Sequence, residues 1–431
     1  MLLTICVLLG VFFVLVMLGV PIAVSIGLAT VSTLLITLPA GAAVTTMAQR
    51  LSSGLDSFTL LAIPFFVISG YLMGRGGIAR RLIEAAKALV GTLPGGLALV
   101  NTISCMLFGS ISGSAVAATS AIGTFMIPTM KDEGYDREFS TAVTITGSIL
   151  GLLIPPSNVL IVYAVAAGSV SIAALFMAGY VPGLLAGAML MLVAAIYSHK
   201  KGYPRSDRIP MRLALKKLAQ AGPSIAMIFI VVGGIIAGIF TATEASAIAV
   251  VYALVLSLIY REIRIPDLPS ILLKSIETTA MVLLLIGVST GMAWVLAYGN
   301  IPQAISEGLL LISDNPFVLL LLINLILLFV GAFLDITPAI LIFTPIFLPV
   351  AMELGMSPLH FGIMLVLNLS IGLCTPPVGS VLFVGCAVGD TTIQKLIRPL
   401  LLLYVALIGA LLLVTYIPFL SEALPRAAGL I

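Results

Sequence analysis

The feature of this chain that most constrains its fold is a sequence repeat across half its length. Residues 151–158 read Gly-Leu-Leu-Ile-Pro-Pro-Ser-Asn and residues 372–379 read Gly-Leu-Cys-Thr-Pro-Pro-Val-Gly, so that Pro155 and Pro376 are 221 residues apart. The same offset relates three further pairs, which are Gly70 and Gly291, Pro128 and Pro349, and Gly134 and Gly355. The repeat predicts two related halves, each with Gly and Pro interrupting an apolar segment at the matching place.

Composition places both halves in a lipid bilayer. The chain has 431 residues, of which 61% are hydrophobic and 9% are charged, and its mean hydropathy is +1.26. Soluble domains are roughly 25% charged, so this chain has too few charged residues to cover its apolar surface in water. Successive apolar windows of roughly 18 or more residues predict an all-α polytopic membrane protein rather than a barrel. The stretch 2–18 lacks a basic start and a cleavage site, so we expect a first span and not a signal peptide.

The positions of the basic residues predict the orientation of the spans. Of the 20 Lys and Arg residues, only Arg50 and Arg426 fall on one side of the predicted bilayer. The other side includes a basic loop at 199–217, which holds Lys200, Lys201, Arg205, Arg208, Arg212, Lys216 and Lys217. Cytoplasmic loops carry the excess of Lys and Arg, so we expect this side to be cytoplasmic and both termini to be periplasmic. The loop is basic for that reason alone, and we expect no nucleic-acid partner.

The apolar segments follow the same order in each half. In the first half we predict spans at 2–18, 22–39 and 58–74, an amphipathic arm at 75–95, a re-entrant hairpin at 95–130 interrupted at 109–114, a span at 139–168 broken at 151–156, and a span at 173–198. In the second half we predict spans at 223–240, 243–260 and 272–297, an arm at 300–315, a hairpin at 315–350 interrupted at 331–337, a span at 359–388 broken at 372–377, and a last span at 399–420. One interruption alone is often an ordinary kink, whereas paired ones are typical of secondary transporters.

The two arms differ in charge. The arm at 75–95 carries Arg75, Arg80, Arg81 and Lys87, whereas the arm at 300–315 carries Glu307 and Asp314 and no basic residue. Basic residues avoid the periplasmic side, so the second arm is expected on the opposite face of the membrane. The sequence therefore predicts two repeats of inverted topology.

The ends of the broken helices are the best candidates for a binding site. A broken helix leaves free carbonyl groups, which suit a hard cation such as sodium, and free amide groups, which suit an anion. The first half offers Ser110, Ser112, Gly113 and Ser114 facing Gly147, Gly151, Pro155, Ser157 and Asn158, and the second offers Gly331, Asp335 and Thr337 facing Gly372, Thr375, Pro376 and Gly379. Hydroxyl side chains in spans also serve as packing contacts between helices, and both interpretations stay open.

Asp335 is the only acid at an interruption of either predicted hairpin. Ionisable groups at membrane depth are costly and mostly functional, which makes Asp335 the strongest single candidate. Its carboxylate is expected to bind sodium, to carry a proton, or only to cap the helix that follows. No Lys or Arg occurs at 88–130, 138–199 or 315–394, so an anionic substrate there would depend on helix amides and bound sodium. Glu244, in Thr241-Ala-Thr-Glu244, is better explained as a helix-start acid.

The sequence offers little support for an enzyme or a bound cofactor. It contains no Gly-x-x-x-x-Gly-Lys-Ser/Thr phosphate loop and no His-Glu-x-x-His zinc helix. The segment 113–117, Gly-Ser-Ala-Val-Ala, departs from the Gly-x-Ser-x-Gly nucleophile motif. The cysteines Cys6, Cys105, Cys374 and Cys386 lie in apolar stretches without a metal-binding or redox spacing. We expect no enzyme activity and no cofactor.

Short motifs along the chain form an ordered set. They include Leu-Ala-Ile-Pro-Phe-Phe at 61–66, Ser-Gly-Ser-Ala at 112–115, Ile-Pro-Pro-Ser at 154–157, Phe-Thr-Ala-Thr-Glu-Ala at 240–245 and Thr-Pro-Pro at 375–377. Over about residues 10–420 this set resembles the large membrane subunit, the DctM-like large permease, of tripartite ATP-independent periplasmic (TRAP) transporters. Where that family usually reads Phe-Thr-Pro-Thr-Glu, this chain has Phe-Thr-Ala-Thr-Glu, a difference at a helix start outside the candidate site.

The resemblance implies sodium-driven uptake of an organic acid, a carboxylate, across the inner membrane of a bacterium or archaeon. It implies a separate small membrane subunit and a periplasmic substrate-binding protein as partners, besides membrane lipid. It also implies an elevator mechanism, in which a transport domain (95–168 and 315–390) moves against a scaffold (1–94, 169–314 and 391–431). The alternative is a stand-alone sodium-coupled carboxylate transporter of a related fold, without a binding protein. A channel or an intramembrane enzyme is disfavoured because the paired broken helices come with no catalytic dyad.

The resemblance also assigns roles to the candidate residues. Sodium is expected at Ser110, Ser112, Ser114, Gly147, Gly151, Pro155, Gly331, Asp335, Thr337, Gly372, Thr375 and Pro376. The substrate is expected between the hairpin tips, at Ser112, Gly113, Pro156, Ser157, Asn158, Asp335, Pro377 and Gly379. The identity of the carboxylate stays open at this point.

Overall fold

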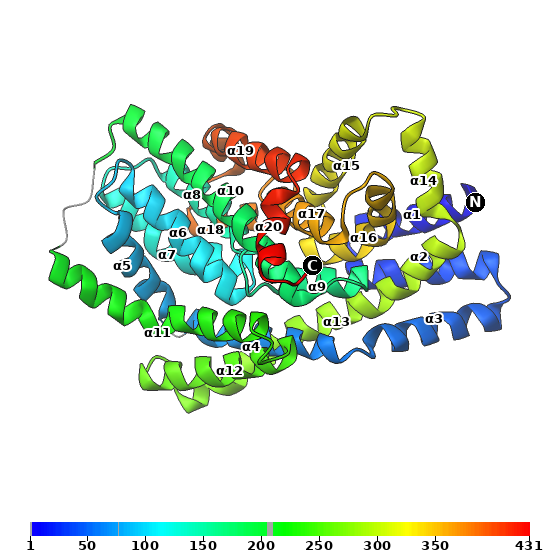
Figure 1. Ribbon diagram of the computed structural model, residues 1–431, viewed down its shortest axis with the longest axis horizontal. Coiled ribbons are helices and arrows are strands. Elements are labelled where there is room, and N and C mark those ends of the chain that lie inside the picture. Colours follow the sequence, from blue (N-terminus) through cyan, green and yellow to red (C-terminus); the bar gives the residue numbers. More distant parts are fainter. Residues whose placement is uncertain (1, 76, 205–209) are drawn as a thin grey trace.

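The computed structural model describes residues 2–75, 77–204 and 210–431, which form helices and no strand (Figure 1). The first half contains α1 (Leu2–Met17), α2 (Ile22–Thr37), α3 (Ala40–Leu55), α4 (Ala62–Arg75), α5 (Ile78–Val90), α6 (Gly96–Ser112), α7 (Ala115–Asp132), α8 (Arg137–Leu150), α9 (Asn158–Ala167) and α10 (Ile172–Lys201). The second half contains α11 (Met211–Ile236), α12 (Ala242–Ile259), α13 (Leu268–Tyr298), α14 (Ile301–Leu310), α15 (Pro316–Gly331), α16 (Ile336–Glu353), α17 (Pro358–Leu373), α18 (Ser380–Val388), α19 (Ile393–Tyr416) and α20 (Phe419–Ala427). Within the described residues, 7 helical segments are long and apolar enough to cross a membrane, as a multi-pass membrane protein requires.

The helices around the two sets of interruptions have matching bounds. Both the first and the last residues of α7 and α16 are 221 positions apart, and α10 and α19 begin 221 positions apart. In each half a helical pair, α6–α7 or α15–α16, is followed by two helices separated by a Pro-Pro segment, α8–α9 or α17–α18. The sequence repeat is therefore also a repeat of helix boundaries.

The two halves interlock through their broken helices. The pair α6–α7 packs on α8, and the pair α15–α16 packs on α17. The second part of each broken helix crosses over, because α9 packs on α16 and α18 packs on α7. Every residue from Phe139 to Leu150 in α8 and from Leu359 to Leu373 in α17 is buried. The core of the molecule thus lies between α8 and α17, with the interruptions around it.

The remaining helices surround this interlocked group. Helix α12 packs on α4 and α11, while α13 packs on α2, α3, α4 and α16. Helix α5 lies against α6 and α11, and α10 packs against both α19 and α20. In Figure 1, α1, α2, α3 and α13 extend towards the end that holds the N-terminus, and the C-terminus lies near the middle of the view.

Two helices were not predicted from the sequence. Helix α3 occupies the stretch between the spans predicted at 22–39 and 58–74, and only Ala43 and Met47 of it are buried. Because it has a narrow apolar face and no continuous apolar run, the hydropathy pattern did not reveal it. The span predicted at 399–420 is α19, which ends at Tyr416, and a separate short helix, α20, begins after Pro418.

The described part of the basic loop predicted at 199–217 is mostly helical. Lys200 and Lys201 belong to the last turn of α10, and α11 begins at Met211, so Lys216 and Lys217 lie in its first turns. Arg205 and Arg208 lie outside the described residues. Helix α11 also begins well before the span predicted at 223–240, because its polar first turns fall below the hydropathy that marks a span.

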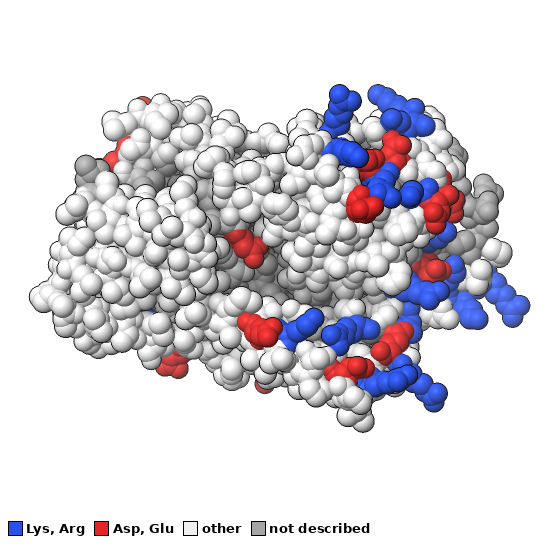
Figure 2. Space-filling view, turned by 180° about the vertical axis from the view of Figure 1, so that it is seen from behind, with Lys and Arg blue, Asp and Glu red and all other residues white. Residues whose placement is uncertain are grey.

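Lys and Arg gather at one end of the molecule. Figure 2 views the molecule from the side opposite to Figure 1 and shows Lys and Arg concentrated towards the right, while the left part of this face is almost free of them. Helix α5, the last turn of α10 and the first turns of α11 contribute Arg80, Arg81, Lys200, Lys201, Lys216 and Lys217. Acidic partners lie among them, as in the Arg81–Glu262 pair at 2.8 Å and the Lys217–Glu84 pair at 2.5 Å.

Helix α12 begins with a complete capping box. The Thr241 hydroxyl accepts a hydrogen bond from the Glu244 amide (3.3 Å), and the Glu244 carboxylate accepts one from the Thr241 amide (2.8 Å). We expect Thr241→Ala to lower the free energy of unfolding by about 1 kcal/mol, measured by reversible unfolding in detergent micelles. Thr241→Ser keeps the hydroxyl and should match the wild type. An Ala variant as stable as the wild type would contradict this role for the cap.

Candidate functional site

Two glycine pairs bring the interruptions of each half into direct contact. A Cβ atom on Gly151 would lie 2.5 Å from the Cα of Gly109 and 2.7 Å from its carbonyl carbon. In the second half, a Cβ atom on Gly372 would lie 2.5 Å from both the Cα and the carbonyl carbon of Gly331. No side chain fits at these distances, so the backbones of the helical pair and the broken helix touch at one point in each half.

The tip of the first helical pair lies against the start of α9. Helix α6 ends at Ser112, and Gly113 follows with a φ of 63°. A Cβ atom on Gly113 would lie 2.6 Å from Nδ2 of Asn158. Ser114 then caps α7, because its hydroxyl accepts a hydrogen bond from the amide of Ala117 (3.2 Å). The sharp turn at Gly113 therefore sets the α7 amide end beside the α9 amide end.

The tip of the second helical pair is bound to the loop before α18. The carbonyl oxygen of Ala332 accepts hydrogen bonds from the amides of Val378 (3.3 Å) and Gly379 (3.2 Å). A Cβ atom on Gly379 would lie 2.8 Å from the carbonyl oxygen of Leu373 and 2.9 Å from that of Thr375. This loop thus folds back over the end of α17 and places the first turn of α18 beside that of α16.

A cavity of about 260 Å³ lies where these tips meet. Its lining includes residues at the starts of four helices, namely Ala115 of α7, Asn158 of α9, Ile336 of α16 and Ser380 of α18. Each helix N-terminus carries a partial positive charge equivalent to roughly half an elementary charge. Four amide ends around one cavity provide the electrostatics of an anion site. Helices α4 and α13 close the cavity with apolar side chains, among them Ile63, Val67, Met281 and Leu285.

Asp335 supplies the carboxylate of this cavity. It is the residue before α16, yet its side chain makes no capping hydrogen bond. The carboxylate lies near the Ile336 amide and the Ser380 hydroxyl, and the side chain stays accessible from the cavity. No Lys, Arg or His is found among the described residues that line this cavity. A charged carboxylate here therefore depends on a cation from solution or on the helix amides.

Five of the residues predicted from the sequence line the cavity together, which are Gly113, Ser114, Asn158, Asp335 and Thr337. They come from both halves, so the structure joins the two predicted sets at one place. They also mix the two predicted roles, because Ser114 and Thr337 were assigned to sodium and Gly113 and Asn158 to the substrate.

Other predicted ligands have hydroxyl groups that turn back to the backbone. Ser110 donates to the carbonyl of Leu107 (2.9 Å), and Thr375 donates to that of Ile371 (2.8 Å). Ser157 donates to the carbonyl of Leu152. The Ser112 hydroxyl is buried and 3.4 Å from the carbonyl oxygen of Ser114. In this arrangement these four hydroxyls lie outside the cavity lining.

The remaining predicted residues shape the backbone around the site. Gly147 packs on α6, where its Cβ would lie 3.2 Å from the Cα of Thr102. The peptide bonds Pro155–Pro156 and Pro376–Pro377 are both cis. Pro155 and Pro156 are buried, whereas Pro376 is half-buried and Pro377 is exposed. A proline offers only its carbonyl oxygen as a polar group, so these positions contribute at most backbone ligands.

The sequence interpretation missed two polar residues that line the cavity. Ser380 directly follows the Pro-Pro-Val-Gly segment, so its place after the second interruption was an available signal. Thr278 lies on α13, and its hydroxyl is 3.0 Å from the hydroxyl of Tyr71. Thr278 is one of several polar residues in this part of α13, Glu277 among them, and only the packing of α13 against α4 and α16 brings Thr278 to the cavity.

Comparison with known proteins places the chain among transporter permeases. The family model for the "Tripartite ATP-independent periplasmic transporter, DctM component" matches residues 9–420. The chain is 54% identical to the uncharacterized protein YgiK of Salmonella typhimurium over 421 aligned residues, and the alignment covers 98% of this chain and 97% of YgiK. It is 42% identical over 407 residues to the C4-dicarboxylate TRAP transporter large permease DctM of Pseudomonas aeruginosa (94% and 95% covered). It is 40% identical over 409 residues to the sialic acid TRAP transporter large permease SiaM of Vibrio cholerae (95% and 95% covered).

A solved membrane transporter shares the fold. The structure of MtrF from Neisseria gonorrhoeae, one of a class of antimetabolite efflux pumps, superposes with a TM-score of 0.62 over 87% of this chain and 84% of that chain. At 14% identity this likeness concerns the fold alone. The family match, in contrast, covers nearly the whole chain, and the relatives named as DctM and SiaM are permeases rather than enzymes. The family resemblance drawn from the sequence motifs is thus confirmed, and the chain belongs to the DctM family, the large permeases of TRAP transporters.

Proposed function

We propose that this chain imports an organic acid across the inner membrane, driven by a sodium gradient, after a periplasmic binding protein delivers the substrate. A separate small membrane subunit completes the transporter, and both termini of this chain face the periplasm. The names of two similar large permeases state their solutes, which are C4-dicarboxylates for DctM and sialic acid for SiaM. Both solutes are carboxylates, so the substrate class proposed here is a small carboxylate.

The observation that carries this proposal is the convergence of four helix amide ends on one cavity that holds a single carboxylate side chain. A substrate carboxylate is favoured by the amide ends of α7, α9, α16 and α18. Asp335 alone would repel it, and a sodium ion beside Asp335 removes that repulsion. The ion and the substrate therefore stabilise each other, which is the physical basis of coupled transport.

The cation site follows from the oxygen atoms around Asp335. Sodium prefers oxygen ligands, and the Asp335 carboxylate, the hydroxyls of Thr337 and Ser380 and nearby backbone carbonyls supply them. A second cation site is proposed in the first half, near Ser114 and the end of α8. The substrate lies between the two tips, beside Gly113 and Asn158.

Transport proceeds by an elevator movement of the interlocked helices. The crossed packing of α9 on α16 and of α18 on α7 supports the movement of residues 95–168 and 315–390 as one body. The two halves are inverted repeats, and the helices outside those ranges form the scaffold against which the body slides.

Reconstitution tests the proposal directly. The chain and its small subunit are placed in proteoliposomes, and the binding protein is added outside with a radiolabelled carboxylate chosen by thermal-shift screening of that binding protein. We expect uptake only with the binding protein, the small subunit and an inward sodium gradient together. Uptake with sodium but without the binding protein would establish the stand-alone transporter instead. Uptake that is unchanged when potassium replaces sodium would overturn sodium coupling.

A further inference from the structure

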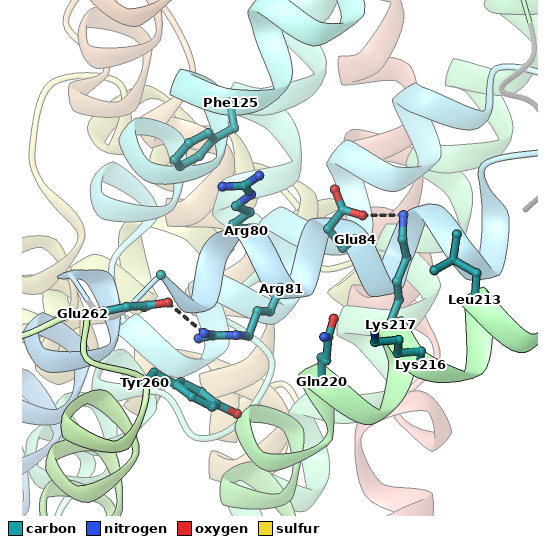
Figure 3. Close-up of a pocket in the computed structure, with 11 residues that line it drawn as sticks. Arg80, Arg81, Glu84, Phe125, Leu213, Lys216, Lys217, Gln220, Tyr260 and Glu262 are labelled. Carbon is teal, nitrogen blue, oxygen red and sulfur yellow. Dashed lines mark ion pairs between the residues drawn. The ribbon is translucent and has the colours of Figure 1, made fainter.

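A second, larger cavity lies at the basic end of the molecule, away from the transport site. Its volume is about 800 Å³, and it is formed by α5, the first turns of α11, the segment after α12 and one residue of α7. Figure 3 shows Glu84 of α5 facing Lys217 of α11, while Arg80 points from α5 towards Phe125 and Arg81 points towards Glu262. We call this cavity the basic pocket.

The carboxylates of the basic pocket neutralise only part of its positive charge. Arg81 pairs with Glu262 at 2.8 Å, and its guanidinium stacks 3.5 Å above the ring of Tyr260. Lys217 pairs with Glu84 at 2.5 Å. The ion pairs found among the described residues leave Arg80 and Lys216 without a carboxylate partner. In addition, the buried Nη1 atom of Arg81 has no hydrogen-bond partner.

Unused donors of this kind point to an anion. Nη1 of Arg81 is itself buried, so the positive charge open to the cavity is that of Arg80 and Lys216. Arg80 and Lys216 line the cavity from two different helices, so the cavity is positively charged on both sides. Arg and Lys are the usual partners of a phosphate group.

Part of the lining of the basic pocket is apolar and exposed. Phe125 of α7 is 50% exposed and Leu213 of α11 is 43% exposed, and both line the cavity. Met211 and Leu215 next to Leu213 are also exposed. Basic residues beside exposed apolar side chains at the end of a span are typical of a site where a lipid headgroup meets its acyl chains.

We propose that the basic pocket binds one anionic phospholipid, whose headgroup is attracted by Arg80 and Lys216 and whose acyl chains lie along Phe125 or Leu213. Because α5 and α11 are scaffold helices and Phe125 belongs to the helical pair of the transport domain, the lipid would bridge the two parts. The proposal does not depend on the identity of the transported solute.

Native mass spectrometry of the purified chain tests the proposal. Phosphatidylglycerol and phosphatidylcholine are titrated separately, without sodium, substrate or binding protein. We expect one phosphatidylglycerol to bind at least about ten-fold more tightly than phosphatidylcholine, because each basic residue near an anionic lipid strengthens binding several-fold. The double variant Arg80→Gln/Lys216→Gln should lose this preference. Equal binding of the two lipids to the wild type, or an unchanged preference in the double variant, would overturn the proposal.

A matched control separates the pocket from general surface charge. Lys200→Gln/Lys395→Gln also removes two exposed basic residues that form no ion pair among the described residues, but neither lines the pocket. This variant should keep the preference for phosphatidylglycerol, and its loss would show non-specific attraction and overturn the assignment. A second experiment adds glycerol 3-phosphate at millimolar concentration as a soluble competitor of phosphatidylglycerol. If it displaces the bound lipid as well as added phosphatidylglycerol does, then the pocket binds a soluble phosphate and the lipid proposal is overturned.

Discussion

Replacing Asp335 with Asn should reduce sodium-driven uptake by about 10-fold to 100-fold, because the variant loses the only carboxylate among the described residues that line the cavity between α7, α9, α16 and α18. A hydrogen bond to a charged group contributes about 1.5–3 kcal/mol, and a loss of this size corresponds to a reduction of about 10-fold to 100-fold. The protein should remain folded, since the Asp335 side chain makes no capping hydrogen bond. The measurement is initial uptake in proteoliposomes as a function of sodium concentration, and we expect half-maximal uptake to require more sodium. Asp335→Ala should behave in the same way.

Two further variants distinguish the role of Asp335. Asp335→Ser removes the charge but keeps a residue that caps helices well, so restored transport in this variant would show that Asp335 only caps α16. Asp314→Asn removes an exposed acid outside the cavity and should leave uptake unchanged. Wild-type sodium dependence in Asp335→Asn would contradict a role in sodium binding.

The second large effect is expected from Gly372→Ala. The added methyl group would lie 2.5 Å from two backbone atoms of Gly331, and backbone moves aside less readily than a side chain. Overpacking of this kind costs about 1–3 kcal/mol, and it would also separate α15 from α17 at the site. We expect a lower yield of folded protein, a lower temperature of unfolding in detergent and almost no uptake. Gly151→Ala should do the same in the first half, because its Cβ would lie 2.5 Å from the Cα of Gly109.

Gly222→Ala is the matched control for these glycines. Gly222 lies inside α11, and no atom lies within 4 Å of a Cβ built there. Alanine is favoured over glycine in a helix interior by about 1 kcal/mol, so this variant should be as stable as the wild type or slightly more stable. If Gly372→Ala unfolds at the same temperature as Gly222→Ala and transports normally, then the direct backbone contact is not needed.

Much of the architecture was accessible from the sequence because it rests on local properties. The apolar windows predicted the helices on both sides of each interruption, and the Gly and Pro segments predicted where those helices end. The interruptions predicted at 109–114 and 331–337 include Ser114 and Asp335, which directly precede α7 and α16. Helix α3 was missed because an amphipathic helix with two buried residues has no hydropathy signal of its own. The basic loop was predicted too long because charged turns of a helix look like a loop when only hydropathy is considered.

The composition of the cavity was less accessible. Ser110 and Thr337 are both hydroxyl residues near an interruption, yet Ser110 donates to its own helix and Thr337 lines the cavity. Which of these occurs depends on the rotation of each helix about its axis, and that rotation is set by packing against a neighbour. Thr278 reaches the cavity only because α13 packs on α4 and α16.

The sequence by itself determined that this protein lies in a membrane, that it has two related halves and that each half has two interrupted segments, since these features follow from hydropathy and from the conformational limits of Gly and Pro. Only the tertiary structure decided that α9 packs on α16 and α18 on α7, and so brought four helix starts to one cavity. The physical reason is that contacts between residues roughly half the chain apart depend on the shapes of surfaces that exist only after the helices have formed and packed.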